Sequence, residues 1–125
     1  MIIKEINPAG SFKNWSKIKL NILYNTSIDN TVGEILLFEN EEIKVWSITL
    51  NPKERLPFHE HTMNYNWTCL TSGRSISYYK TGKIIETIYQ KGDILFYDHS
   101  ENGSFIHDIE NNGTSILKFI TVEYK

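Results

Sequence analysis

The sequence predicts an all-β domain folded as a sandwich or barrel. Short segments rich in β-branched and aromatic residues recur along most of the chain, and glycine-containing turns separate them at intervals of about 8 to 12 residues. Evenly spaced short strands of this kind are typical of sandwiches and barrels. The composition agrees, since 40% of the 125 residues are hydrophobic and 13% are aromatic, which suits one packed core and not a disordered chain.

The strands can be placed in order along the chain. An apolar run at residues 35–38 and a β-branched, aromatic run at 43–50 come first, followed by turn residues at 51–54 and an extended segment with two histidines. Six further strands are predicted at residues 66–70, 75–79, 84–89, 93–97, 104–109 and 115–122. Only residues 12–22 have a mixed pattern that allows a helical turn. We therefore expect one domain over residues 1–125, with an arm of flanking strands at 1–40 and a barrel at 41–125.

Charge and cysteine content exclude several classes of partner. The net charge is −2, from 13 basic and 15 acidic residues mixed along the chain without a basic stripe, so nucleic acid is not expected as a partner. Lys4 and Glu5 lie where a signal peptide would need its apolar region, and no apolar run approaches the length of a membrane span. The single cysteine, Cys69, has no partner for an internal disulfide. These features predict a cytoplasmic protein with no membrane partner.

Three of the four histidines form a pattern typical of a metal site. His59 and His61 are one residue apart on an extended segment, so their side chains point to the same side of it. His107 lies far along the chain and can complete one face of a coordination sphere. Neutral imidazole is a common ligand of zinc, iron, copper and nickel. We predict a divalent metal ion held by His59, His61 and His107.

The residues around these histidines resemble the two motifs of the cupin superfamily. The first motif, G-x5-H-x-H-x(3,4)-E-x6-G, is matched at His59, His61 and Gly73, and the second, G-x5-P-x-G-x2-H-x3-N, at Gly92, His107 and Asn111. The departures are Lys53 for the opening glycine, Asp98 for the proline, and four additional residues before His107. The motifs span residues 53–113, about half of the chain. The resemblance implies a cupin double-stranded β-helix, also called a jelly-roll barrel.

A finer resemblance is to small cupins labelled as β-alanine degradation proteins. It is carried by residues 55–61, 66–68, 107–111 and 121–124. The label implies an association with amino-acid catabolism and does not specify a reaction.

The most informative departure from the cupin motif is Asn66, which stands where the glutamate ligand is expected. Asparagine is neutral and a weaker donor, so an ion held by three imidazoles would keep its double positive charge and open coordination positions. Such a centre favours an anionic or bidentate ligand, for example a carboxylate, an enolate or an amino acid. Some cupin dioxygenases use three histidines, which makes iron one option. The ligand set leaves zinc, nickel, manganese and copper open as well.

Four further residues are predicted to line the pocket: Asn66, Thr68, Tyr78 and Arg55. Thr68 shares the strand parity of Asn66, and Tyr78 or its neighbour Tyr79 must face inward by alternation. Arg55 could close the mouth over a carboxylate, although an arginine in such a place more often lies on a solvated rim. Cys69, of opposite parity to Thr68, is expected to point away from the pocket as a small buried hydrophobic residue.

Two functions from different classes remain open at this stage. One is a metal-dependent oxygenase, isomerase or lyase acting on a small anionic metabolite, either a carboxylate or an amino-acid-like molecule. The other is a non-catalytic cupin that binds a metabolite, as a sensor or accessory protein, without requiring a metal. The apolar residues of the segment 1–40 predict a homodimer formed through outer strands, the alternative being a monomer with an extended outer sheet.

Overall fold

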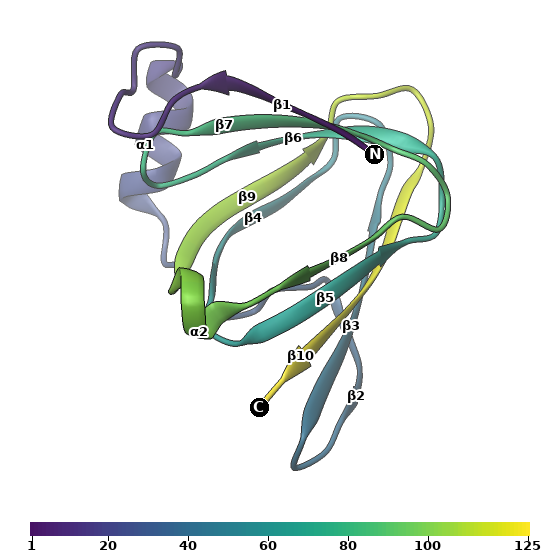
Figure 1. Cartoon of the computed structure of the whole chain (residues 1–125). Coiled ribbons are helices and arrows are strands. Elements are labelled where there is room, and N and C mark those ends of the chain that lie inside the picture. Colours follow the sequence, from purple (N-terminus) through teal and green to yellow (C-terminus); the bar gives the residue numbers. More distant parts are fainter.

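Residues 1–125 of the computed structural model form two antiparallel five-stranded sheets that face each other (Figure 1). The first sheet has the order β1 (Ile2–Asn7), β7 (Ile84–Tyr89), β6 (Gly73–Tyr78), β9 (Phe105–Asn111) and β4 (Arg55–His61). The second has the order β2 (Ile35–Glu39), β3 (Ile43–Leu50), β10 (Leu117–Tyr124), β5 (Asn64–Cys69) and β8 (Ile94–Tyr97). The predicted all-β class is thus confirmed.

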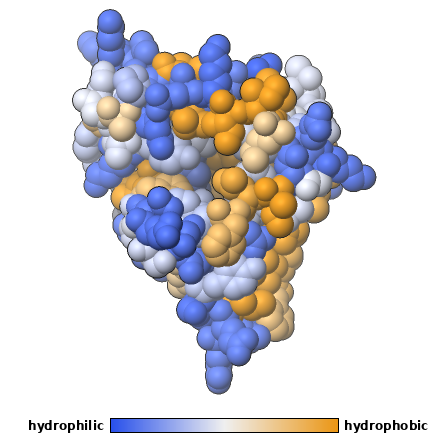
Figure 2. Space-filling model, viewed as in Figure 1, coloured by the Kyte–Doolittle hydropathy of each residue, from blue (hydrophilic) through white to orange (hydrophobic).

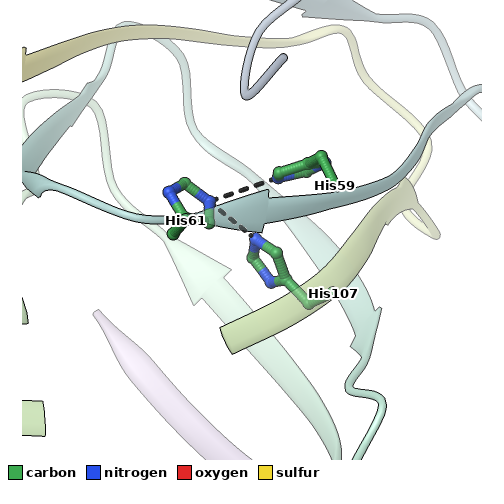
Figure 3. A group of neighbouring side chains, drawn as sticks. All are labelled: His59, His61 and His107. Atoms are coloured by element: carbon green, nitrogen blue, oxygen red, sulfur yellow. Dashed lines mark hydrogen bonds between the residues drawn. The ribbon is translucent and has the colours of Figure 1, made fainter. Parts of the chain in front are cut away.

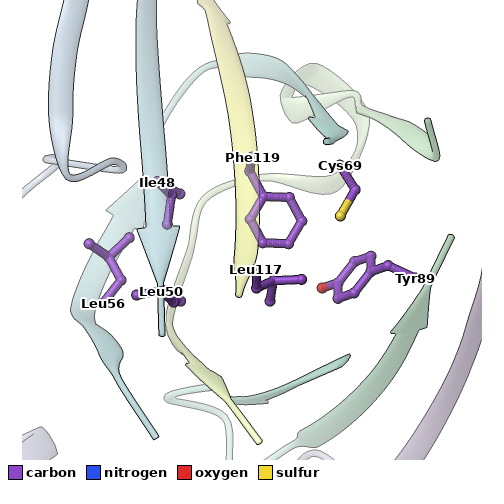
Figure 4. Packing of buried hydrophobic residues seen from close by; sticks show 7 residues of the cluster. All are labelled: Ile48, Leu50, Leu56, Cys69, Tyr89, Leu117 and Phe119. Carbon is purple, nitrogen blue, oxygen red and sulfur yellow. The ribbon is translucent and has the colours of Figure 1, made fainter. Parts of the chain in front are cut away.

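Side chains alternate along the strands between the interior, where the two sheets face each other, and the outside. In β10, buried residues at every second position face the other sheet, and the residues between them face outward. The same alternation in five strands, β3, β4, β5, β7 and β10, brings seven buried side chains together (Figure 4): Ile48, Leu50, Leu56, Cys69, Tyr89, Leu117 and Phe119. This cluster fills one part of the interior and leaves the rest for the cavity described below.

Two short helices complete the chain. Helix α1 (Lys17–Asn25) begins where the side chain of Ser16 accepts a hydrogen bond from the backbone N–H of Lys19, at 3.0 Å. The expected helical turn at 12–22 therefore starts later, because this cap fixes the beginning of the helix. Leu23 of α1 packs with Trp15 and Phe58 in a second hydrophobic cluster on the outer face of the first sheet. Helix α2 (His99–Asn102) is a single turn that accommodates inserted residues before His107. Neither helix has the length and hydropathy of a membrane span.

A β-bulge in β4 determines which residues face the interior. Leu56 pairs with Ile109 and His59 pairs with His107, so Pro57 and Phe58 together oppose the single residue between these partners. Both Leu56 and His59 line the interior, whereas Phe58 packs outside against Trp15. Proline suits this position because it has no N–H to lose from the ladder.

Candidate metal centre

The three predicted histidines converge between the sheets. His59 and His61 project from β4. His107 projects from β9, at the position that pairs with His59. The Nε2 atom of His61 lies 3.2 Å from Nε2 of His59 and 3.1 Å from Nε2 of His107 (Figure 3). Three nitrogens bound to one ion at about 2.0–2.1 Å would be separated by roughly 3 Å. The predicted histidine cluster is confirmed as a group close enough to hold a metal ion.

Hydrogen bonds between neutral rings cannot account for this convergence. Nδ1 of His59 lies 2.7 Å from the carbonyl oxygen of Pro57, to which it donates its hydrogen, so Nε2 of that ring carries a lone pair. Nε2 of His61 then has two nitrogen neighbours but holds either one hydrogen or one lone pair. It cannot satisfy both contacts at once. A cation in the middle satisfies all three lone pairs, and the residues present therefore fit a metal ion.

Burial keeps the three imidazoles in the neutral form that binds metals. Desolvation lowers the pKa of His59, and it lowers the pKa values of His61 and His107 well below the ordinary value of 6.5. The neighbouring histidines add a smaller shift in the same direction for His61 and His107. The Nδ1 atoms of His61 and His107 are buried without a hydrogen-bond partner. Only His59 therefore has its ring hydrogen fixed by the protein.

The histidines lie in the wall of a cavity of about 580 Å³ between the two sheets. In Figure 2 the surface is hollowed between the sheets on the face shown. No aspartate or glutamate lines this cavity, and its one charged side chain is Lys83. Seven aromatic side chains other than histidine contribute to the walls: Tyr65, Trp67, Tyr79, Tyr89, Tyr97, Phe105 and Phe119. The site therefore combines three neutral nitrogen donors with apolar walls and no negative charge.

Comparison with solved structures identifies the fold. No family model matches the sequence, and no curated protein matches it. A cupin domain from Bordetella pertussis Tohama I has a TM-score of 0.64 at 18% identity, over 80% of this chain and 98% of that one. The chain has a cupin fold.

Other solved structures agree. A cupin superfamily protein from Desulfitobacterium hafniense has a TM-score of 0.53 at 14% identity, over 72% of this chain and 73% of that one. An uncharacterized conserved protein with a double-stranded β-helix domain from Klebsiella pneumoniae has a TM-score of 0.57 at 19% identity, over 76% and 79% of the two chains. Likeness at such identities shows the cupin double-stranded β-helix and not a reaction. The resemblance to β-alanine degradation proteins is not shown by these comparisons.

The interior position after the histidine pair is occupied by Tyr65 and not by Asn66. Tyr65 stacks on His61 with ring centroids 4.2 Å apart and lines the cavity. Asn66 faces the outside of the sheet, where its side-chain oxygen accepts a hydrogen bond from the Tyr124 hydroxyl. The expectation for Asn66 is thus corrected by one residue. In the cupin motif the spacing between the second histidine and the acidic ligand is three or four residues, and the shorter spacing selects Tyr65.

The other pocket residues predicted with Asn66 are also placed differently. Thr68 shares the outward parity of Asn66, so it does not line the cavity, while Trp67 does. Cys69 points between the sheets and not away from them, where it is fully buried and its pKa is raised by burial. Strand parity thus runs opposite to the expectation throughout β5.

Tyr78 and Arg55 lie on the outer face of the first sheet. Tyr78 packs edge-on against Trp15 at 5.0 Å, and its neighbour Tyr79 lines the cavity instead, 5.0 Å from the ring of His107. Arg55 does not reach the mouth because its Nε pairs with Asp108 at 2.6 Å. Tyr79 was one of the two alternatives given by strand alternation.

Sequence reasoning missed two residues that face the cavity, Lys83 and Tyr65. Lys83 lies in the turn between β6 and β7, with its Nζ 4.5 Å from the ring centroid of Tyr79. The hydroxyls of Tyr65 and Tyr79 make no hydrogen bond within the chain, and burial raises the pKa of Tyr79 to about 12 and that of Tyr65 further. Both phenols therefore stay protonated and can donate a hydrogen bond to a bound molecule. The parity shared by His59, His61 and Tyr65 is the signal that could have identified Tyr65.

Proposed function

We propose that this protein binds a divalent metal ion through His59, His61 and His107 and takes up a small anionic metabolite at the remaining coordination positions. The observation that carries the proposal is the meeting of three imidazole nitrogens that neutral rings cannot hydrogen-bond to one another. The absence of a carboxylate from the cavity wall adds the preference for an anion, because nothing in the wall offsets the charge of the ion.

The residues of the chain have distinct roles in this proposal. The three histidines hold the ion, with His59 oriented by the Pro57 carbonyl. The hydroxyls of Tyr65 and Tyr79 donate hydrogen bonds to the bound metabolite, and the aromatic walls exclude water from it. A bound divalent ion supplies Lewis-acid polarisation of a ligand oxygen. Three imidazole donors suit iron, zinc, nickel or copper, whereas manganese, the other ion considered, prefers oxygen ligands.

If the protein is an enzyme, an oxygenase, isomerase or lyase suits this donor set, with the phenols as the groups that hold a proton. The alternative is a non-catalytic cupin that binds or senses a metabolite, and one observation favours it. The cavity wall contains no carboxylate to serve as a general base. Retention of the ligand unchanged by metal-loaded protein would support this alternative.

The metal proposal is tested by elemental analysis of protein purified without added metal and by titration of the metal-free protein. We expect about one ion per chain, and a loss of affinity of at least about 100-fold in His61→Ala and in His107→Ala, because each removes a direct ligand. The matched control is His99→Ala, whose ring lies outside the cavity and contacts Ser104. Equal metal affinity in all three variants would refute the proposal.

We further propose that the protein is a cytoplasmic homodimer. The outer face of the second sheet exposes apolar side chains that a partner subunit would cover: Ile35, Phe38, Ile94 and Phe96, each more than half exposed. Figure 2 shows orange surface along the lower right flank, where Figure 1 places β2, β3 and β10. The unpaired Cys69 is consistent with a reducing compartment. The mass in solution, compared with 14.6 kDa for one chain, checks the dimer.

A further inference from the structure

The cavity wall contains a positively charged side chain and no negatively charged one. Lys83 is its one charged side chain, and this lysine forms no ion pair with a carboxylate. Its Nζ lies against the face of Tyr79, which in turn lies beside His107. A divalent ion on the three histidines would add a second positive centre to the same cavity. The cavity thus offers two positive centres and no negative one.

This distribution distinguishes between two kinds of small anion. The carboxylate of an amino acid would be attracted, but its ammonium group would enter a site with no carboxylate to pair with it. An unpaired ammonium group held near other cations is costly to desolvate. A hydroxyl or keto oxygen at the same position carries no charge. It can approach the ion or accept a hydrogen bond from the free hydroxyls of Tyr65 and Tyr79.

The residues of the cavity wall indicate what the rest of the ligand must be. Trp67, Tyr89 and Phe119 pack edge to face, with ring centroids 5.1–5.6 Å apart, and all three line the cavity. Aromatic walls of this kind favour an apolar body, and ring edges pack well against a further ring. A volume of about 580 Å³ is larger than a two- or three-carbon acid needs and falls in the range of small-molecule sites.

We propose that the ligand is a carboxylate with an uncharged oxygen on the neighbouring carbon, an apolar ring-sized body and no amino group. This inference rests on the proposed function and specifies the class of anion bound at the same site. Lys83 supplies the second positive charge, and the aromatic walls contact the body. Amino acids are thereby excluded from the anions considered at the outset.

Matched probes test the inference by calorimetric titration of the full chain loaded with Zn²⁺. Phenyllactate has a hydroxyl group where phenylalanine has an ammonium group. Lactate lacks the ring of phenyllactate. We expect phenyllactate to bind at least about tenfold more tightly than either of the other two. Lys83→Met should weaken phenyllactate about tenfold, and Lys118→Met, on the outer face of β10, should leave it unchanged.

The outcomes separate this inference from the proposed function. Protein that retains Zn²⁺ but binds phenylalanine as tightly as phenyllactate, or binds none of the three probes, overturns the inference and leaves the metal proposal standing. Protein that retains no Zn²⁺ overturns both. Tyr79→Phe, which keeps the ring and removes the hydroxyl, provides a second variant if Lys83→Met does not fold. A loss of phenyllactate affinity in this variant supports the inference, and unchanged affinity contradicts the assigned hydrogen bond.

Discussion

The buried aspartate and the buried histidines on the two faces of the β4–β9 strand pair have different surroundings. On the outer face, Asp108 is fully buried and accepts hydrogen bonds from Lys19 Nζ at 2.8 Å, Arg55 Nε at 2.6 Å and the backbone N–H of Tyr78 at 2.8 Å. On the inner face the preceding residue, His107, meets two other imidazoles and no carboxylate.

This difference indicates what each face is for. Asp108 has every partner that a buried carboxylate needs, and those partners connect α1 and β4 to β9. On the inner face, the Nδ1 atoms of His61 and His107 are buried without a hydrogen-bond partner. Polar groups that a fold leaves unmatched in a cavity are the ones available to a ligand. The outer face is therefore structural, and the inner face is where we propose that the ligand binds.

The largest effect is expected for Asp108→Ala. It leaves Arg55 and Lys19 half-buried without their partner, and breaking a buried ion pair costs about 3–5 kcal/mol of unfolding free energy. Urea denaturation measures this change. Glu39→Gln is the control, since it removes an exposed ion pair with Lys125 and should leave the unfolding free energy nearly unchanged. Equal losses in the two variants would contradict the structural role assigned to the buried Asp108.

A smaller effect is expected for Tyr65→Glu, which makes the inner face resemble the outer one by adding a carboxylate beside His61. The carboxylate offsets the charge of the ion, so metal affinity should rise and phenyllactate affinity should fall, each by about tenfold or 1.4 kcal/mol. Chelator competition and calorimetry measure the two affinities. Tyr65→Gln has nearly the same shape without the charge, and identical behaviour of both variants would contradict the electrostatic explanation.

The smallest effect is expected for Glu123→Gln. Glu123 is buried on the inner side of β10, where Trp46 Nε1 donates a hydrogen bond to it at 2.8 Å, and burial raises its pKa above the ordinary 4.5. The folded state therefore holds this proton more tightly than the unfolded state, so unfolding free energy falls as pH rises from 4.5 through the folded pKa. Denaturation curves across this range should show a decline that Glu123→Gln lacks. A decline of the same size in the variant would assign it to other groups.

Most of the fold was predictable because its signals are local. Runs at 35–38, 43–50 and 84–89 coincide with β2, β3 and β7 to within a residue, since turns with glycine or proline mark their ends. β1 was not placed as a separate strand. It lies at the edge of its sheet with Ile2 and Ile3 exposed, so its sequence lacks a clear alternation of buried and exposed positions.

The histidines of the site were predictable, and the residues around them were less so. His59, His61 and His107 follow from strand parity and a motif spacing. Asn66 was chosen on a motif spacing that allows two values, and a shift of one residue reverses every side chain of a strand. Arg55 was expected at the mouth because the sequence does not show that Asp108 would be buried on the other face.

The closeness of His61 and His107 affects how the chain unfolds. His61 and His107 are separated by 46 positions in sequence, yet a single ion would connect them. Such a link acts as a removable crosslink between β4 and β9, and closing a long loop in the unfolded chain is entropically expensive. The ion would therefore resist separation of the first sheet's strands, so that loading with metal would set how long the folded barrel persists as well as what it binds.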